Sequence, residues 1–190
     1  MAGPPRATFA RMQDSTADDY AIILARHAEH VDGHADRVLE AMRVLGEGDA
    51  GYAVSRLEHS LQSATRAYRG GRDTDYVVMC LLHDIGDTLA PRNHGAFAAA
   101  VLEPYVSPKL TWITKHHPVF QFHYYGTHVG ADPDARERYR GHEWFDDTVA
   151  FCELYDENCF DEHYESLPLE TFAPLVREVL ERAPGNRPDV

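Results

Sequence analysis

Histidine and aspartate residues recur through the middle of the chain, at positions where helices are expected. The pair His83 and Asp84 closes the most apolar segment, residues 77–82. Burying a carboxylate beside an imidazole costs several kcal/mol unless a metal ion or a counter-charge compensates for it. A bound metal ion is therefore the economical explanation for this pair.

Other candidate ligands lie on or beside further predicted helices. A helical bundle can project one ligand from each of several helices into a shared cavity. The candidate set comprises four imidazoles and two carboxylates: His59, His83, Asp84, His94, His117 and Asp156. Nitrogen and oxygen ligands without a thiolate suit iron, manganese, magnesium or zinc in a reactive site rather than a structural zinc. His116 is an alternative to His117, because adjacent imidazoles point about 100° apart on a helix.

Helices are the elements expected to position these ligands. Apolar residues recur with helical spacing over 54–68, around His59. Asp73 or Thr74 can cap the next helix, and its residues 77–82 are apolar nearly all round, which is typical of a central buried helix. Gly86 closes this helix just past His83 and Asp84. Further helices are predicted over 16–45 with a break near Gly33, over 91–104, over 142–157 and over 169–182.

Two prolines set the expected bounds of the helix that carries His116 and His117. Ser107 followed by Pro108 is a strong start signal, with serine as N-cap and proline in the first position. We expect the helix to end at His117, because Pro118 cannot continue it. The aromatic and charged segment 118–141 is then expected to be an ordered excursion.

Length and composition favour one domain. A chain of 190 residues, 44% of them hydrophobic, can bury a sizeable core, and no Gly/Ser/Pro-rich linker divides it. No segment alternates with period two for long enough to require a strand. We therefore expect an all-α, compact single-domain helical bundle over 1–190. Its core would span about 54–161, with N-terminal helices over 16–45 and a C-terminal helix over 169–182.

The net charge and the cysteines indicate which classes of partner and which cellular compartment to expect. The formal charge of −13 disfavours nucleic acid as a partner. Cys80, Cys152 and Cys159 are an odd number without C-x-x-C spacing, which argues against a disulfide framework and favours a reducing cytoplasm. No stretch approaches the ~20 apolar residues that span a bilayer, and the N-terminus lacks a secretory apolar region. We expect a cytoplasmic protein without a membrane partner.

The order of His59, His83-Asp84 and Asp156 resembles the H…HD…D pattern of the HD-domain superfamily. The resemblance covers roughly 54–161. It is closest in the blocks 57–62 (Leu-Glu-His-Ser-Leu-Gln) and 81–86 (Leu-Leu-His-Asp-Ile-Gly). These blocks look particularly like the branch of mixed-valent di-iron oxygenases that contains myo-inositol oxygenase and the aminohydroxyethylphosphonate oxygenase.

This resemblance implies an HD-type fold and a centre of two iron ions, Fe(II) and Fe(III). Asp84 would be the catalytic carboxylate that bridges them. His59, His83 and Asp156 would complete one site, and His94 with His117 the other. The implied reaction uses O2 to oxidise and cleave a small hydroxylated substrate.

The substrate pocket is expected to be bordered by Tyr52, Asp87, Lys115 and His123. Asp87 stands where myo-inositol oxygenase has a lysine, and Asp49 and Tyr52 stand where the phosphonate enzyme has a tyrosine and a glutamate. Substrate identity therefore does not transfer from either enzyme. The sequence does not indicate the oligomeric state.

The same ligand set is compatible with a metal-dependent phosphohydrolase acting on a small phosphoester or nucleotide. Two ions, then Mn, Mg or Zn, would hold a hydroxide that attacks phosphorus. Such an enzyme usually needs Arg or Lys near the phosphate, and near the ligands the sequence offers Arg56, Arg92 and Lys115. A metal-free or metal-storing binding protein is a third alternative, but it does not explain why the His and Asp side chains are buried together. The oxygenase is the preferred hypothesis.

Overall fold

The computed structural model describes residues 3–185, and this part of the chain is helical without any strand. The predicted all-α class is confirmed. None of its helices has the length and apolar character needed to cross a membrane. The α-helices are α1 (Ala17–Asp32), α2 (His34–Val44), α3 (Arg56–Arg69), α4 (Thr74–Leu82), α5 (His94–Leu102), α6 (Pro108–Val129), α7 (Phe145–Tyr155) and α8 (Leu169–Leu180). Two short 3-10 helices are η1 (Met12–Asp14) and η2 (Ala135–Tyr139).

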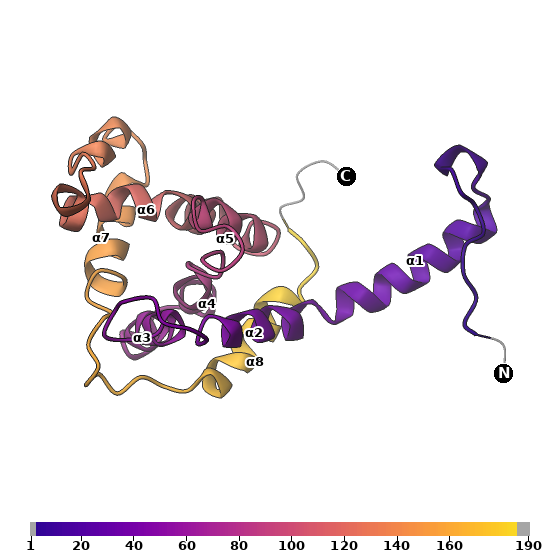
Figure 1. Ribbon diagram of the computed structural model, residues 1–190, viewed down its shortest axis with the longest axis horizontal. Helices are drawn as coiled ribbons and strands as arrows, with labels where there is room; N and C mark the ends of the chain where they lie inside the picture. The colour runs from indigo at the N-terminus through magenta and orange to yellow at the C-terminus, as the bar shows by residue number, and fades with distance from the viewer. Residues whose placement is uncertain (1–2, 186–190) are drawn as a thin grey trace.

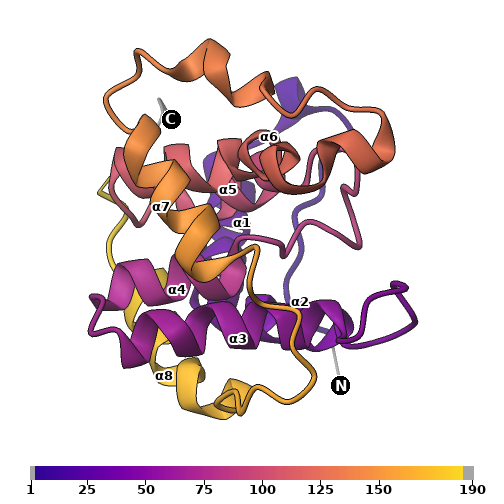
Figure 2. The ribbon, with the colours of Figure 1, turned by 90° about the vertical axis from the view of Figure 1, so that its left-hand side faces the viewer.

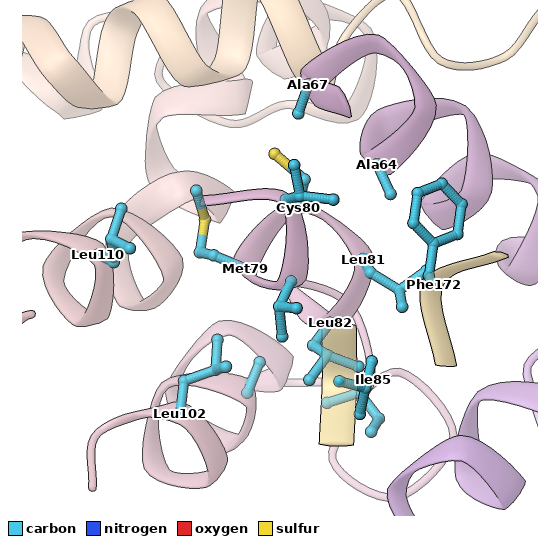
Figure 3. Close-up of a cluster of buried hydrophobic side chains, with 14 of the residues drawn as sticks. Ala64, Ala67, Met79, Cys80, Leu81, Leu82, Ile85, Leu102, Leu110 and Phe172 are labelled. Carbon is cyan, nitrogen blue, oxygen red and sulfur yellow. The ribbon is translucent and has the colours of Figure 1, made fainter. Parts of the chain in front are cut away.

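Helix α4 lies at the centre of the body that α2 to α8 form (Figure 1). Residues 77–82 are at most 1% exposed, and α3, α6 and α8 all contact α4. Figure 3 shows the α4 side chains among Ala64 of α3, Leu102 of α5 and Phe172 of α8. A helix that is apolar on every side is stable only in such surroundings. The predicted central buried helix is confirmed.

The remaining helices bring distant parts of the sequence together. α5 packs against α6, α6 against α7, and α7 returns to contact α3 (Figure 2). The helices that carry the predicted ligands are therefore neighbours in space, although they span about a hundred residues of sequence. Figure 1 also shows that α1 extends away from this body.

Capping side chains set where the helices begin. Ser55 and Ser107 cap α3 and α6 by accepting hydrogen bonds from the backbone N–H groups three residues later. Asp73, rather than Thr74, caps α4, accepting from the Tyr76 N–H at 2.8 Å. Each cap supplies a partner for an N–H group that the first turn of a helix leaves free.

Helix α6 is longer than predicted, because it continues through Pro118 to Val129 instead of ending at His117. Proline lacks the N–H that would bond to the carbonyl of Thr114, four residues earlier. Nδ1 of His117 donates to this carbonyl at 2.7 Å, so the acceptor keeps a partner. The segment expected to be an excursion is helical until Gly130, whose φ of 73° ends the helix in the left-handed conformation.

Candidate metal centre

All six predicted ligands meet at one place in the body. His59 comes from α3, His83 and Asp84 follow the end of α4, His94 opens α5, His117 lies on α6, and Asp156 follows the end of α7. His59, His83, His117 and Asp156 are buried, at most 4% exposed. The side chains of Asp84 and His94 are 17% and 23% exposed, so the cluster is closed on one side and accessible on the other.

One half of the cluster consists of His59, His83, Asp156 and one oxygen of Asp84. The Nε2 atoms of His59 and His83 lie 3.1 Å apart, and Asp156 Oδ1 lies 3.2 and 3.6 Å from them. Asp84 Oδ2 lies 3.5 and 3.4 Å from the same two nitrogens. Atoms with such mutual separations can surround an ion at about 2.1 Å, the distance at which imidazole and carboxylate bind zinc-like ions.

The other oxygen of Asp84 faces a second pair of imidazoles. Asp84 Oδ1 lies 3.1 Å from Nε2 of His117 and 3.4 Å from Nε2 of His94. The two oxygens of one carboxylate thus point at two different sets of nitrogen ligands. A carboxylate that bridged two metal ions would need this arrangement.

Three of the imidazoles are fixed by backbone carbonyls. Because a carbonyl only accepts, the Nδ1 atom that meets it carries a proton, and Nε2 faces the cluster, where it offers a lone pair once it is deprotonated. The three Nδ1 donors and their acceptors are His59 to Cys159 at 3.1 Å, His83 to Cys80 at 2.7 Å, and His117 to Thr114 at 2.7 Å. These rings need no reorganisation to bind a metal ion.

His94 is held differently, by a carboxylate. Its Nδ1 lies 3.2 Å from Oδ1 of Asp87, while Oδ2 of Asp87 pairs with Nε of Arg56 at 3.1 Å. Burial and the charge of Asp84 raise the pKa of Asp87. A carboxylate partner of this kind orients a metal-binding imidazole and makes it more basic.

We expect Asp87→Ala to weaken the ion beside His94 selectively. Loss of a residue that orients a ligand typically costs about 10–100-fold in metal affinity, and the ion beside His59 and His83 would keep its affinity. Calorimetric titration of metal-free protein checks this, with Asp147→Ala as a control, because Asp147 pairs with Lys109 at the surface. Equal loss at both sites, or at neither, would contradict the role given to Asp87.

In the cluster without a metal ion, protonated imidazole offsets the charge of the carboxylates. Burial would raise the pKa of the Asp84 carboxyl, but the charge of His83 and the hydrogen bond from His117 outweigh it and hold that pKa far below its ordinary value. Burial lowers the pKa of the His83 imidazole. The charges of Asp84 and Asp156 outweigh this effect and raise that pKa to about 10. A metal ion binding here must displace the His83 proton and take over its charge.

Asp156 carries one of several buried side-chain atoms that have no hydrogen-bond partner. Oδ2 of Asp156 is buried without a hydrogen-bond donor. Leaving such a group unsatisfied costs about 1–3 kcal/mol, and more when it is charged. An ion bound between His59, His83 and Oδ1 of Asp156 would neutralise the charge of this carboxylate, so the donor set fits a metal on chemical grounds.

A cavity of about 690 Å³ opens onto the cluster. This volume is within the range of small-molecule sites. Its wall is largely apolar or aromatic, and Phe160 stacks on the His59 ring at 4.5 Å and lies 5.1 Å from the Tyr52 ring. The other apolar and aromatic wall residues are Val54, Pro91, Pro118, Tyr124, Tyr125 and Val129.

Two of the four predicted pocket residues line this cavity, namely Tyr52 and Asp87. Lys115 and His123, the other two, are exposed on α6 and are not among the residues that line it. Because residues on a helix advance by about 100°, both point away from the face of His117. His116 also faces elsewhere: its ring stacks on Trp112 at 3.6 Å, and its Nδ1 donates to the Trp112 carbonyl.

Comparison with known proteins assigns no family. No family model matches the chain, and no curated protein matches it. What the centre can do is therefore inferred from its residues, their geometry and the motif order.

Sequence reasoning missed several wall residues. Gln121 lies one helical turn beyond His117 and would have been found had α6 been expected to pass Pro118. Glu157 follows the ligand Asp156 directly. Phe160 gives no signal in the sequence, because its place over His59 depends on how the chain after α7 returns to α3.

Proposed function

We propose that this chain is a dinuclear-metal oxygenase of the HD-domain type, which binds Fe(II) and Fe(III) and uses O2 to oxidise and cleave a small hydroxylated substrate. The two oxygens of Asp84, aimed at separate sets of imidazoles on the floor of a cavity, are its principal support. The nitrogen-rich ligand set adds to it, because imidazole suits iron better than it suits magnesium or calcium.

The six residues would form two ligand sets, one for each metal ion. His59, His83 and Asp156 would hold one ion together with Oδ2 of Asp84. His94 and His117 would hold the other together with Oδ1 of Asp84, and this smaller set leaves coordination positions open towards the cavity. When bound, a mixed-valent iron pair supplies the redox chemistry that activates O2 and oxidises a carbon–hydrogen bond.

The cavity wall serves this chemistry by excluding water. Phe160 covers the His59 ring, and Tyr124 and Tyr125 border the same space from α6. A dry site protects reactive oxygen chemistry from side reactions. The substrate would enter from the side of His94 and Asp84, which are the more exposed ligands.

A phosphohydrolase is the second candidate, because a bridging carboxylate between two ions equally suits a metal-held hydroxide. Among the described residues that line the cavity, Arg56 is the only lysine or arginine, and it is paired with Asp87. A phosphate group would therefore find no unpaired cation on the wall apart from the metals. This charge distribution favours the oxygenase.

The experiment that tests the proposal starts with protein purified from iron-supplemented cells. We expect two irons per chain by elemental analysis, the low-temperature EPR signal of a coupled Fe(II)/Fe(III) pair, and O2 uptake with a member of a panel of small hydroxylated compounds. His117→Ala should abolish the signal, while the control His123→Ala, on the exposed side of α6, should retain it. Magnesium, manganese or zinc, with phosphoester hydrolysis and no O2 uptake, would assign the second candidate instead.

A further inference from the structure

Residues 3–32 form an arm with a structure of its own. Thr16 and Asp19 form a capping box at the start of α1, and the Thr8 N–H donates to Asp19 at 2.8 Å. The Phe9 ring stacks on Tyr20, so the segment before α1 folds back along the helix. Figure 1 shows this arm projecting well beyond the body.

The direction of the arm is fixed at its base. Gly33 separates α1 from α2 with a φ of −85°, which any residue can adopt. Arg37, in the first turn of α2, donates from Nη2 to the carbonyl of His30 in the last turn of α1, at 2.6 Å. This hydrogen bond joins α1 to α2 across the junction, and the body of the same chain leaves most of α1 exposed.

One face of α1 is apolar and uncovered. Its residues follow a spacing of four, three, four and three, which is the spacing of a seam between two packed helices. All five are exposed, with Leu24 at 61% and Val31 at 49%: Ala17, Ala21, Leu24, Ala28 and Val31. An isolated helix of 16 residues is marginal in water, so such a face needs a partner to be stable.

The exposed area is sufficient for a stable dimer. The chain exposes 11137 Å² of accessible surface, whereas a compact chain of 21.4 kDa is expected to expose about 9,100 Å². A specific interface takes about 800 Å² from each partner. The excess over a compact chain is larger than this area, and most residues of α1 are among the exposed ones.

We propose that the arm is a dimerisation element, in which the apolar face of α1 packs against a second copy of this chain. A closed two-fold pair allows the same face to serve both copies and leaves neither arm uncovered. The net charge of −13 disfavours nucleic acid and anionic lipid as occupants. It also makes two copies repel, so the dimer should tighten as salt is added.

Light scattering after size-exclusion chromatography, and sedimentation over a range of concentrations, test the proposal on the full chain. The wild type should have twice the chain mass of 21.4 kDa. Leu24→Glu combined with Val31→Glu should give a monomer that keeps the helical circular dichroism of the body and loses at most the part that α1 contributes. The matched control Leu89→Glu changes an exposed leucine of the body, 73% exposed, and should remain dimeric.

Two results would overturn the arm as a dimer interface. One is a wild-type chain that is monomeric at every concentration and salt level tested. The other is a dimer that survives the double substitution on α1. If the monomer instead sediments with phosphatidylcholine/phosphatidylserine vesicles, and the double variant does not, the face belongs to a membrane surface and the proposal fails.

Discussion

Asp84→Asn is expected to leave a folded chain that no longer holds two ions. The amide has one acceptor oxygen and no charge, so it can serve only one of the two imidazole sets that the carboxylate faces. We expect a loss of metal affinity well beyond the roughly 100-fold that residues behind the ligands contribute, with activity at background. Elemental analysis should fall from two ions per chain to one at most.

Asp146→Asn is the control, because this aspartate is exposed in the first turn of α7. It should bind both ions with wild-type affinity. Circular dichroism on both variants separates loss of metal from loss of fold. An Asp84→Asn chain that keeps two ions would remove Asp84 from the role of bridge.

Gly95→Ala is expected to damage the second ion site and to lower stability. A Cβ at Gly95 would lie 2.9 Å from the Thr114 carbonyl oxygen and 2.9 Å from Cγ of Pro118, so α5 must move away from α6. His94 moves with α5, and the Thr114 carbonyl is the atom that orients His117. Overpacking costs typically about 1–3 kcal/mol, which outweighs the roughly 0.5–1 kcal/mol that alanine contributes to a helix.

Thermal unfolding and metal titration measure the two effects of this substitution. Gly141→Ala is the matched control, because nothing lies within 4 Å of its Cβ position and its φ is not left-handed. The variant should unfold at a lower temperature than the control and should lose the ion beside His94 first. Equal behaviour of the two variants would mean that the approach of α5 to α6 does not set the site.

Local patterns were enough to predict much of the fold and the ligand cluster. The unbroken apolar run at 77–82 identified the central helix, and the burial that it implies drew attention to His83 and Asp84. The order of His59, Asp84 and Asp156 then brought in residues that only the packing of α3, α4 and α7 places side by side. That inference depended on the resemblance to the H…HD…D pattern and on chemistry, because a cation or a counter-charge must offset the burial of these groups.

The errors arose where a tertiary contact overrides a local rule. Pro118 was expected to end α6, because helix propensities describe single residues. They do not include the hydrogen bond that the His117 side chain donates to the Thr114 carbonyl, which the proline leaves without its backbone donor. His123 follows Pro118, so the direction of its side chain depends on the helix continuing. Lys115 lies two residues before His117, and the helical phase alone turns it away from the face of His117. Choosing between His116 and His117 also needed this geometry.

Anomalous X-ray diffraction at the iron edge, on crystals of iron-loaded protein, tests the dinuclear centre most directly. Two peaks should flank Asp84, one beside His59, His83 and Asp156 and the other beside His94 and His117. A single peak, or iron bound elsewhere, would contradict a centre built on the two oxygens of this carboxylate.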